Sequence, residues 1–197
     1  MNQVFESMIT SYILNKVGIS DQFVNTTLSA HLKNRLLYLY LGNDMKTADK
    51  RNEIIILKDT TRRSDKLYWL DPKNKNIYED EFVKLMDEFV SYLNETCYTG
   101  ITGYEFHYSF YEKVSFYGRH LDTFKNNDSR QYSMITYLNT DWQPVDGGEL
   151  SIHHVNGLTQ QISPTSCKSV FFRSTELEHE IMVTNVPRLA ITGWLKR

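Results

Sequence analysis

Tyr104-Glu-Phe-His-Tyr-Ser-Phe-Tyr111 is the stretch that decides the fold class, because large hydrophobic residues occupy every second position from Tyr104 to Phe110. A period of two is typical of a β-strand with one buried face. Shorter runs of the same kind follow, and turn residues such as 126–128, Gly147-Gly148 and Pro164 separate them. These runs cover residues 132–138, 149–153, 169–172, 180–183 and 189–195. Many short strands joined by turns predict a β-sandwich or jelly roll.

The first hundred residues follow a different pattern. Hydrophobic residues recur at spacings of three and four over residues 1–45 and again over residues 79–96, which predicts amphipathic helices. Residues 46–66 are rich in Lys and Arg and contain a single β-type run at residues 54–57. We interpret residues 46–66 as a mobile loop or hairpin.

Together these patterns predict an α+β fold with a double-stranded β-helix (jelly-roll) core and N-terminal supporting helices. The chain of 197 residues is 41% hydrophobic and 23% charged, which is typical of one soluble globular domain. We therefore predict a single domain over residues 1–197. Residues 1–100 form its helical support and the loop, and residues 101–197 form its core.

Charge and cysteine content exclude several classes of protein. The formal net charge of −2 and a pI near 6.3 give no electrostatic reason to expect nucleic acid or an anionic membrane as a partner. Cys97 and Cys167 lack the paired spacing of a thiolate metal site and are too few for a disulfide scaffold. No apolar run approaches the ~20 residues that a membrane span needs. With no secretion signal recognised, we expect a cytoplasmic protein.

His120-Leu-Asp122 is the first sign of chemistry. On an extended segment, residues two apart point to the same face, so an imidazole and a carboxylate would lie together. A third ligand would complete the 2-His-1-carboxylate facial triad that holds non-haem Fe(II) with open coordination positions. Taken alone, the pair is more often a structural hydrogen bond, but His179 offers that third ligand.

His179 opens a strand-like run, and Arg188-Leu-Ala-Ile-Thr-Gly-Trp194 follows it. If residues 184–187 form a hairpin turn, His179 lies opposite Thr192 and shares a face with Arg188, about 13 Å away at ~3.3 Å per residue. A diacid chelated to a metal at His179 could then reach Arg188, whose planar fork pairs well with a carboxylate. Arg188 in an ordinary ion pair is the alternative.

Two further residues fit the same picture. Tyr137 shares a face with Ser133 and Ile135 in its strand, so its phenol could add a donor to the carboxylate, although simple core packing also explains it. Thr192 could hydrogen-bond a metal-bound water or a cosubstrate oxygen.

The sequence resembles the prolyl-hydroxylase branch of the Fe(II)- and 2-oxoglutarate-dependent oxygenases, especially the hypoxia-inducible-factor prolyl hydroxylases and their bacterial relatives. The resemblance covers most of the chain, and six motifs carry it. They are Phe116-Tyr-Gly-Arg-His120-Leu-Asp122, Tyr137-Leu-Asn-Thr-Asp-Trp142, Gly147-Gly-Glu-Leu150, Val170-Phe-Phe, His179-Glu and Arg188-Leu-Ala-Ile-Thr-Gly-Trp194. A weaker similarity extends to Asp65-Lys-Leu-Tyr-Trp-Leu70 and Gly18-Ile.

The resemblance implies a role for each matching residue. His120, Asp122 and His179 would bind Fe(II), while Arg188 and Tyr137 would hold the tail of 2-oxoglutarate. Tyr111 is similar to the family's pocket tyrosine, although the segment from it to His120 is slightly shorter here. The cosubstrates implied are 2-oxoglutarate and O2, with ascorbate as a candidate auxiliary cofactor.

The resemblance further implies hydroxylation of a prolyl residue in a polypeptide partner, with release of succinate and CO2. Two alternatives stay open at this stage. The same chemistry could act on a free amino acid or another small molecule, or the chain could be a non-catalytic metal-binding jelly-roll module. Arg188 argues against the non-catalytic metal-binding module, because metal binding alone does not require an arginine away from the ligands.

Overall fold

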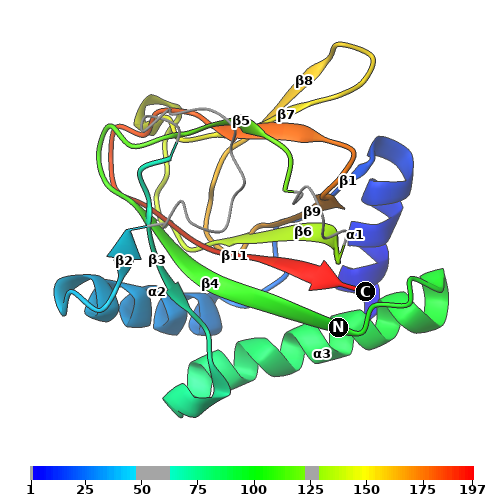
Figure 1. Cartoon of the computed structure of the whole chain (residues 1–197), viewed down its shortest axis with the longest axis horizontal. Coiled ribbons are helices and arrows are strands. Elements are labelled where there is room, and N and C mark those ends of the chain that lie inside the picture. Colours follow the sequence, from blue (N-terminus) through cyan, green and yellow to red (C-terminus); the bar gives the residue numbers. More distant parts are fainter. Residues whose placement is uncertain (1, 48–62, 123–128) are drawn as a thin grey trace.

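The computed structural model describes residues 2–47, 63–122 and 129–197, and Figure 1 shows two layers of strands with helices packed on one side. The strands form a large antiparallel sheet, in the order β1-β9-β6-β11-β4-β3-β2, and a small one, in the order β5-β10-β7-β8. The elements are α1 (Asn2–Asn15), β1 (Val17–Ser20), α2 (Thr26–Leu41), β2 (Lys46–Thr47), β3 (Lys66–Trp69), η2 (Pro72–Asn74), α3 (Ile77–Cys97), β4 (Gly103–Tyr111), β5 (Tyr117–His120), β6 (Arg130–Tyr137), η3 (Pro144–Asp146), β7 (Leu150–His153), β8 (Thr159–Ile162), β9 (Ser169–Arg173), β10 (Glu178–Ile181) and β11 (Arg188–Lys196).

The three helices cover the outer face of the large sheet, and one hydrophobic core joins them to it. Phe5 of α1, Leu32 of α2 and Phe89 of α3 belong to the same buried cluster as Phe106 and Ile191 of the sheet. Figure 1 shows α2 and α3 running beneath β4, with α1 beside β1. The helices therefore serve as a support that leaves the other face of the sheet for the site.

Side-chain caps fix where the helices begin. The carboxamide oxygen of Asn25 accepts a hydrogen bond from the backbone N–H of Leu28 at 2.8 Å, and that of Asn76 accepts from the N–H groups of Tyr78 and Glu79, both at 3.1 Å. Each cap satisfies backbone donors that a first helical turn leaves without partners.

The alternation of side chains along β11 divides the molecule into two cores. Leu189, Ile191 and Leu195 pack toward the helices, whereas Ala190 lies in a second core between the two sheets. Ile152 of β7 and Phe172 of β9 close that inner core from either side. The predicted α+β fold with a jelly-roll core is confirmed.

The sequence pattern found some strands and missed others. All six of the predicted strands are present, as β4, β6, β7, β9, β10 and β11. The pattern missed β1, β3, β5 and β8, each of four residues, which are too few to establish a period by themselves. The equally short β7 and β10 were predicted from the runs 149–153 and 180–183. The expected β-type run at residues 54–57, most of the predicted loop 46–66 and the predicted turn at residues 126–128 lie outside the described residues.

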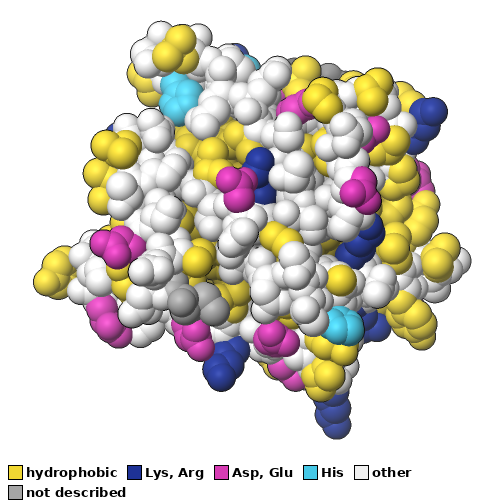
Figure 2. Space-filling view, turned by 180° about the vertical axis from the view of Figure 1, so that it is seen from behind, with side chains coloured by type: hydrophobic (Ala, Val, Ile, Leu, Met, Phe, Trp, Pro, Cys, Tyr) yellow, Lys and Arg dark blue, Asp and Glu magenta, His cyan; other side chains and the backbone are white. Residues whose placement is uncertain are grey.

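The surface of the described residues mixes chemical types. Figure 2 shows acidic and basic side chains interspersed among hydrophobic ones on the face opposite to that of Figure 1. Among the described residues, no helix is long and apolar enough to span a membrane.

Candidate functional site

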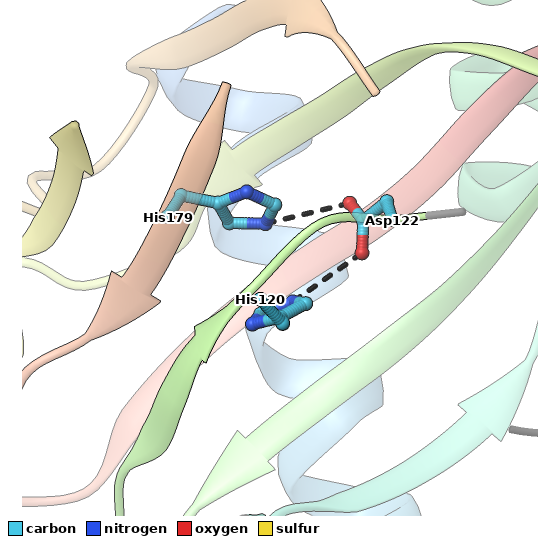
Figure 3. A group of neighbouring side chains, drawn as sticks. All are labelled: His120, Asp122 and His179. Carbon is cyan, nitrogen blue, oxygen red and sulfur yellow. Dashed lines mark ion pairs between the residues drawn. The ribbon is translucent and has the colours of Figure 1, made fainter. Parts of the chain in front are cut away.

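Three side chains converge where the two strands β5 and β10 pair. His179 of β10 lies directly opposite His120, the last residue of β5, and directly opposed residues of an antiparallel pair point to the same face. Asp122 follows β5 after a single intervening residue. Figure 3 shows both imidazoles directed at the carboxylate of Asp122.

The distances suit a shared cation. The Nε2 atoms of His120 and His179 each lie 3.4 Å from an oxygen of Asp122, one imidazole on each carboxylate oxygen. One ligand atom from each of the three residues falls within 4.8 Å of the others. Two imidazoles and one carboxylate are the donor set of a facial triad, which suits non-haem Fe(II) with coordination positions left open.

Backbone carbonyls fix the orientation of both imidazoles. Nδ1 of His120 lies 2.8 Å from the carbonyl oxygen of Gly118, and Nδ1 of His179 lies 3.2 Å from that of Leu177. A carbonyl can only accept, so each Nδ1 carries the proton and donates it. The lone pair of each Nε2 is then free to face a metal.

A buried serine pair orients the carboxylate. Ser133 of β6 donates a hydrogen bond to Oδ2 of Asp122 at 2.7 Å, and its own hydroxyl lies 2.9 Å from that of Ser174. The backbone N–H of Asp122 donates to the carbonyl of Ser174 at 3.2 Å. Neither serine lies in a recognisable sequence motif, so neither was predicted as a site residue.

The electrostatics of the cluster favour positive charge at its centre. Burial alone would raise the pKa of the Asp122 carboxyl, but the imidazoles of His179 and His120 outweigh burial and hold that pKa well below its usual range. Burial would likewise lower the pKa of His179, yet the Asp122 carboxylate raises it. A divalent cation supplies the same positive charge in place of a proton.

Arg188 is a buried cation whose charge is not matched within the described residues. Its side chain is 0% exposed, and among the described residues it forms one hydrogen bond, from Nε to the carbonyl oxygen of Gly148 at 2.8 Å. Within the part of the chain that the structure describes, both terminal nitrogens of its guanidinium lack a hydrogen-bond partner, as does the hydroxyl of Tyr137. Burying an uncompensated charge costs several kcal/mol. The two terminal nitrogens and the phenol therefore provide donors for the carboxylate of a bound ligand.

Two tyrosines flank this guanidinium. Its central carbon lies 5.2 Å from the ring centroid of Tyr111 and 5.1 Å from that of Tyr137. Burial raises the pKa of Tyr137 to about 12, although Arg188 lowers it, so the phenol keeps its proton and can donate. Tyr137, Ser133 and Ile135 were predicted to share one face of their strand, and all three face the inner core or Asp122.

The expected hairpin between His179 and Arg188 was wrong. His179 belongs to the small sheet, paired with His120 and Ile152, whereas Arg188 belongs to the large sheet, paired with Tyr111. Residues 182–185 instead bond to neighbouring loops, and the segment crosses from one sheet to the other. In this segment the backbone N–H groups of Met182, Thr184 and Asn185 donate to the carbonyl oxygens of Glu149, Ser115 and Asp146, respectively. The carbonyl oxygen of Thr184 accepts from the N–H of Val114. Arg188 still reaches the inner core, but from the opposite sheet.

The predicted placement of Thr192 was wrong for the same reason. Its register partners are His107 and Ile135, not His179. Thr192 has the same parity as Ala190 and so faces the inner core, where its hydroxyl accepts a hydrogen bond from Ser109 at 3.3 Å. Gly148, whose carbonyl accepts the bond from Arg188, was identified as a turn residue and as part of a resemblance motif, but not as a partner of Arg188.

The similarity to known proteins agrees with this geometry. Residues 106–196 match the sequence model of the 2OG-Fe(II) oxygenase superfamily. The structure is similar to that of a prolyl-4-hydroxylase from Pseudomonas putida, with a TM-score of 0.89, 27% identity and coverage of 98% of each chain.

Two further structures share the fold. One is a prolyl hydroxylase from Trichoplax adhaerens, solved with a peptide fragment of the hypoxia-inducible-factor oxygen degradation domain; its TM-score is 0.86 at 23% identity, over 98% of this chain and 89% of that one. The other is the epimerase SnoN, solved with Fe3+, alpha-ketoglutarate and nogalamycin RO. Its TM-score is 0.69 at 9% identity, over 100% of this chain and 85% of the SnoN chain. The chain thus has the sequence pattern of the 2OG-Fe(II) oxygenase superfamily over residues 106–196 and, over nearly its whole length, the fold of the superfamily's prolyl-hydroxylase branch.

Proposed function

We propose that this protein is an Fe(II)- and 2-oxoglutarate-dependent dioxygenase that hydroxylates a prolyl residue of a polypeptide and releases succinate and CO2. The observation that carries the proposal is the buried guanidinium of Arg188, whose terminal nitrogens have no partner in residues 2–47, 63–122 and 129–197. It packs against Tyr111 and Tyr137 of the inner core, and His179 contacts Phe172 of the same core. A metal site alone does not require a buried cation of this kind, whereas a metal-chelating diacid does.

His120, Asp122 and His179 would hold Fe(II) through two Nε2 atoms and one carboxylate oxygen. Bound Fe(II), with 2-oxoglutarate and O2, supplies the oxidising chemistry that inserts one oxygen atom into a C–H bond. The protein's own part is to orient these ligands: the carbonyls of Gly118 and Leu177 fix the imidazoles, and Ser133 fixes the carboxylate.

Arg188 and Tyr137 would bind the far carboxylate of 2-oxoglutarate. The guanidinium offers two parallel N–H donors, the geometry that pairs with a carboxylate, and the phenol adds a third donor. Tyr111 packs against the same guanidinium from β4, opposite Arg188 in register, and would help to hold its plane.

A polypeptide is the better substrate proposal, and a small molecule is the alternative. Both prolyl hydroxylases named above support the former, since one was solved with a peptide and the two share the fold at TM-scores of 0.89 and 0.86. The likeness to SnoN supports the latter, at a TM-score of 0.69. The expected cytoplasmic location and the use of ascorbate stay predictions.

Turnover of 2-oxoglutarate tests the chemistry. The purified protein, supplied with Fe(II), O2 and 2-oxoglutarate, should form succinate, and His179→Ala should abolish it through loss of a metal ligand. His153→Ala is a matched control on the neighbouring strand β7, where His153 bonds to Glu180 rather than to the cluster, and should keep the wild-type rate. No succinate from the wild type would refute the enzyme proposal and favour the non-catalytic metal-binding module.

Mass spectrometry of the host proteome tests the substrate class. Proteins from the parent strain and from a strain lacking this gene should differ at one or a few prolines, by the mass of one oxygen atom. If the purified enzyme forms succinate but the two proteomes carry the same prolyl modifications, the small-molecule alternative replaces the polypeptide proposal.

A further inference from the structure

A second group of polar atoms without partners lies on the inner face of the large sheet, away from Arg188. It comprises His107 of β4 and Trp194 of β11, with Trp69 of β3 beside them. The ring of His107 lies 4.9 Å from that of Trp69 and 5.4 Å from that of Trp194. His107 is 1% exposed and Trp194 5%, whereas Trp69 is 45% exposed, so the group runs from the interior to the surface.

His107 is an unusual core residue because no described residue forms a hydrogen bond with either of its ring nitrogens. Both Nδ1 and Nε2 are buried without a partner among the described residues. The indole nitrogen of Trp194 is likewise buried and has no partner among them. Leaving a buried polar group unsatisfied costs about 1–3 kcal/mol for each group. A Leu or Met at position 107 would avoid that cost, so these donors and acceptors indicate a ligand.

This group adjoins the candidate metal site through the sheet itself. Trp194 lies directly opposite Ser133, the residue whose hydroxyl donates to Asp122. His107 lies opposite Thr192 and Trp69. Arg188, the proposed partner of the far carboxylate of 2-oxoglutarate, is at the other end of the same strands, where it pairs with Tyr111. Tyr111 lies four residues from His107 along β4, about 13 Å at ~3.3 Å per residue.

The chemistry of the group selects an uncharged ligand. Burial, followed by the charge of Arg63, lowers the pKa of His107 to about 3, so at neutral pH the imidazole has one donor and one acceptor nitrogen. Nearby charged side chains are already paired with one another, Arg63 with Asp65 and Arg130 with Glu105. A peptide group, with one carbonyl acceptor and one N–H donor, matches this set better than the two charges of a free amino acid.

We propose that His107 is a substrate-positioning residue whose uncharged imidazole, together with the indole N–H of Trp194, hydrogen-bonds a peptide group of the polypeptide beside the metal ligands. The proposal rests on the proposed function and adds how the substrate main chain is held. The prolyl nitrogen has no hydrogen, so the N–H that His107 accepts comes from a neighbouring residue of the substrate.

Substitution at His107 separates a substrate role from a structural one. His107→Met removes both unsatisfied nitrogens, so its melting temperature should equal or exceed that of the wild type at neutral pH. The probe is a pool of synthetic proline-containing peptides with blocked ends, scored by mass spectrometry for hydroxylation and by succinate formation. For peptides that the wild type hydroxylates, His107→Met should raise the KM roughly tenfold, the loss of about one hydrogen bond. The KM for 2-oxoglutarate should not rise with it.

Two variants complete the comparison. His107→Gln keeps an uncharged donor and acceptor and should recover part of the affinity for peptide. His31→Met is the control, because it removes a histidine that stacks on Tyr78 among the helices. Equal peptide KM values for wild type, His107→Met and His31→Met would overturn the proposal, leaving a trapped water as the partner of His107. Succinate formation without hydroxylation of any peptide also counts against it, whereas no succinate at all refutes the proposed function instead.

Discussion

At the scale of single residues, the site is organised by polar groups that the fold buries and leaves incompletely bonded. Among the residues that the structure places, Arg188 has one hydrogen bond, to Gly148, and both its terminal nitrogens are unpaired. Asp122 differs, because Ser133 and two imidazoles surround its carboxylate. The first arrangement suits an exchangeable anion, and the second suits a cation that stays bound.

Ser133→Ala tests how far the hydroxyl orients the metal ligand. We expect a 10–100-fold loss of Fe(II) or Mn(II) affinity, the usual effect of removing a partner of a ligand, because Asp122 can then rotate. Metal titration monitored by calorimetry measures it. Ser169→Ala is the matched control, since that buried hydroxyl bonds to Thr136 on the adjacent strand and to no other described side chain. Equal losses in both variants would contradict an orienting role for Ser133.

The buried imidazole of His107 predicts a pH dependence of stability. Its pKa is about 3 in the folded protein, against an ordinary value of 6.5, so below pH 6.5 the unfolded chain binds a proton that the folded one does not. The wild type therefore loses stability as the pH falls from 6.5 toward 3, and His107→Met lacks this loss. Between pH 7.5 and pH 5.5, the free energy of unfolding of the wild type should fall by about 1.4 kcal/mol more than that of His107→Met. Urea unfolding at pH 7.5 and 5.5 measures it, and a difference that does not change with pH would contradict a buried neutral His107.

At the scale of elements, β11 is central, because it pairs with β4 on one side and β6 on the other and carries Arg188, Thr192 and Trp194 on one face. Its approach to β4 is close at Gly193, where an added Cβ would meet the ring of Phe106 and the backbone oxygen of Glu105. Only glycine fits this position without a shift of the neighbouring strand.

Gly193→Ala should therefore destabilise the protein by about 1–3 kcal/mol, the usual cost of overpacking a core. Gly103→Ala, at the start of β4, has no atom within 4 Å of its added Cβ and should change stability by less than about 0.5 kcal/mol. Chemical denaturation of the two variants measures both values. Similar midpoints for the two would mean that β4 can move away from β11 at little cost.

The elements also show what the sequence could predict. Period-two runs identified β4, β6 and β11, because each of these strands has eight or more residues. The sheet to which each strand belongs could not be predicted, because the long-range backbone bonds of Thr184 to Val114 and Ser115, not the local turn, direct the chain from β10 across to β11.

The candidate site was predictable to the same extent. His120 and Asp122 were identified from their spacing, and His179 and Arg188 from their offset, although the hairpin geometry used to relate the last two was wrong. Ser133 and His107 were missed as site residues, since a lone Ser or His in a strand gives no local signal of what it faces across the sheet.

At the scale of the whole molecule, the site depends on both sheets at once. The small sheet supplies His120 and His179, and the large sheet supplies Arg188 and Tyr137, with the helices closing only the outer face. A ligand that binds the metal and Arg188 together would tie the two sheets to each other. Metal and 2-oxoglutarate should therefore stabilise the protein together, by about 2.7 kcal/mol for a ligand at a hundred times its Kd.

Calorimetric titration of 2-oxoglutarate into the Mn(II)-loaded protein, where no turnover occurs, tests the central claim most directly. We expect binding by the wild type that EDTA abolishes. Arg188→Met should weaken it 10–100-fold, the loss of a charge-assisted pair of hydrogen bonds. The variant's melting temperature without ligand should not fall, because an uncompensated buried charge has been removed. Binding of 2-oxoglutarate with equal affinity by the wild type and Arg188→Met, or by the wild type with and without metal, would contradict the account.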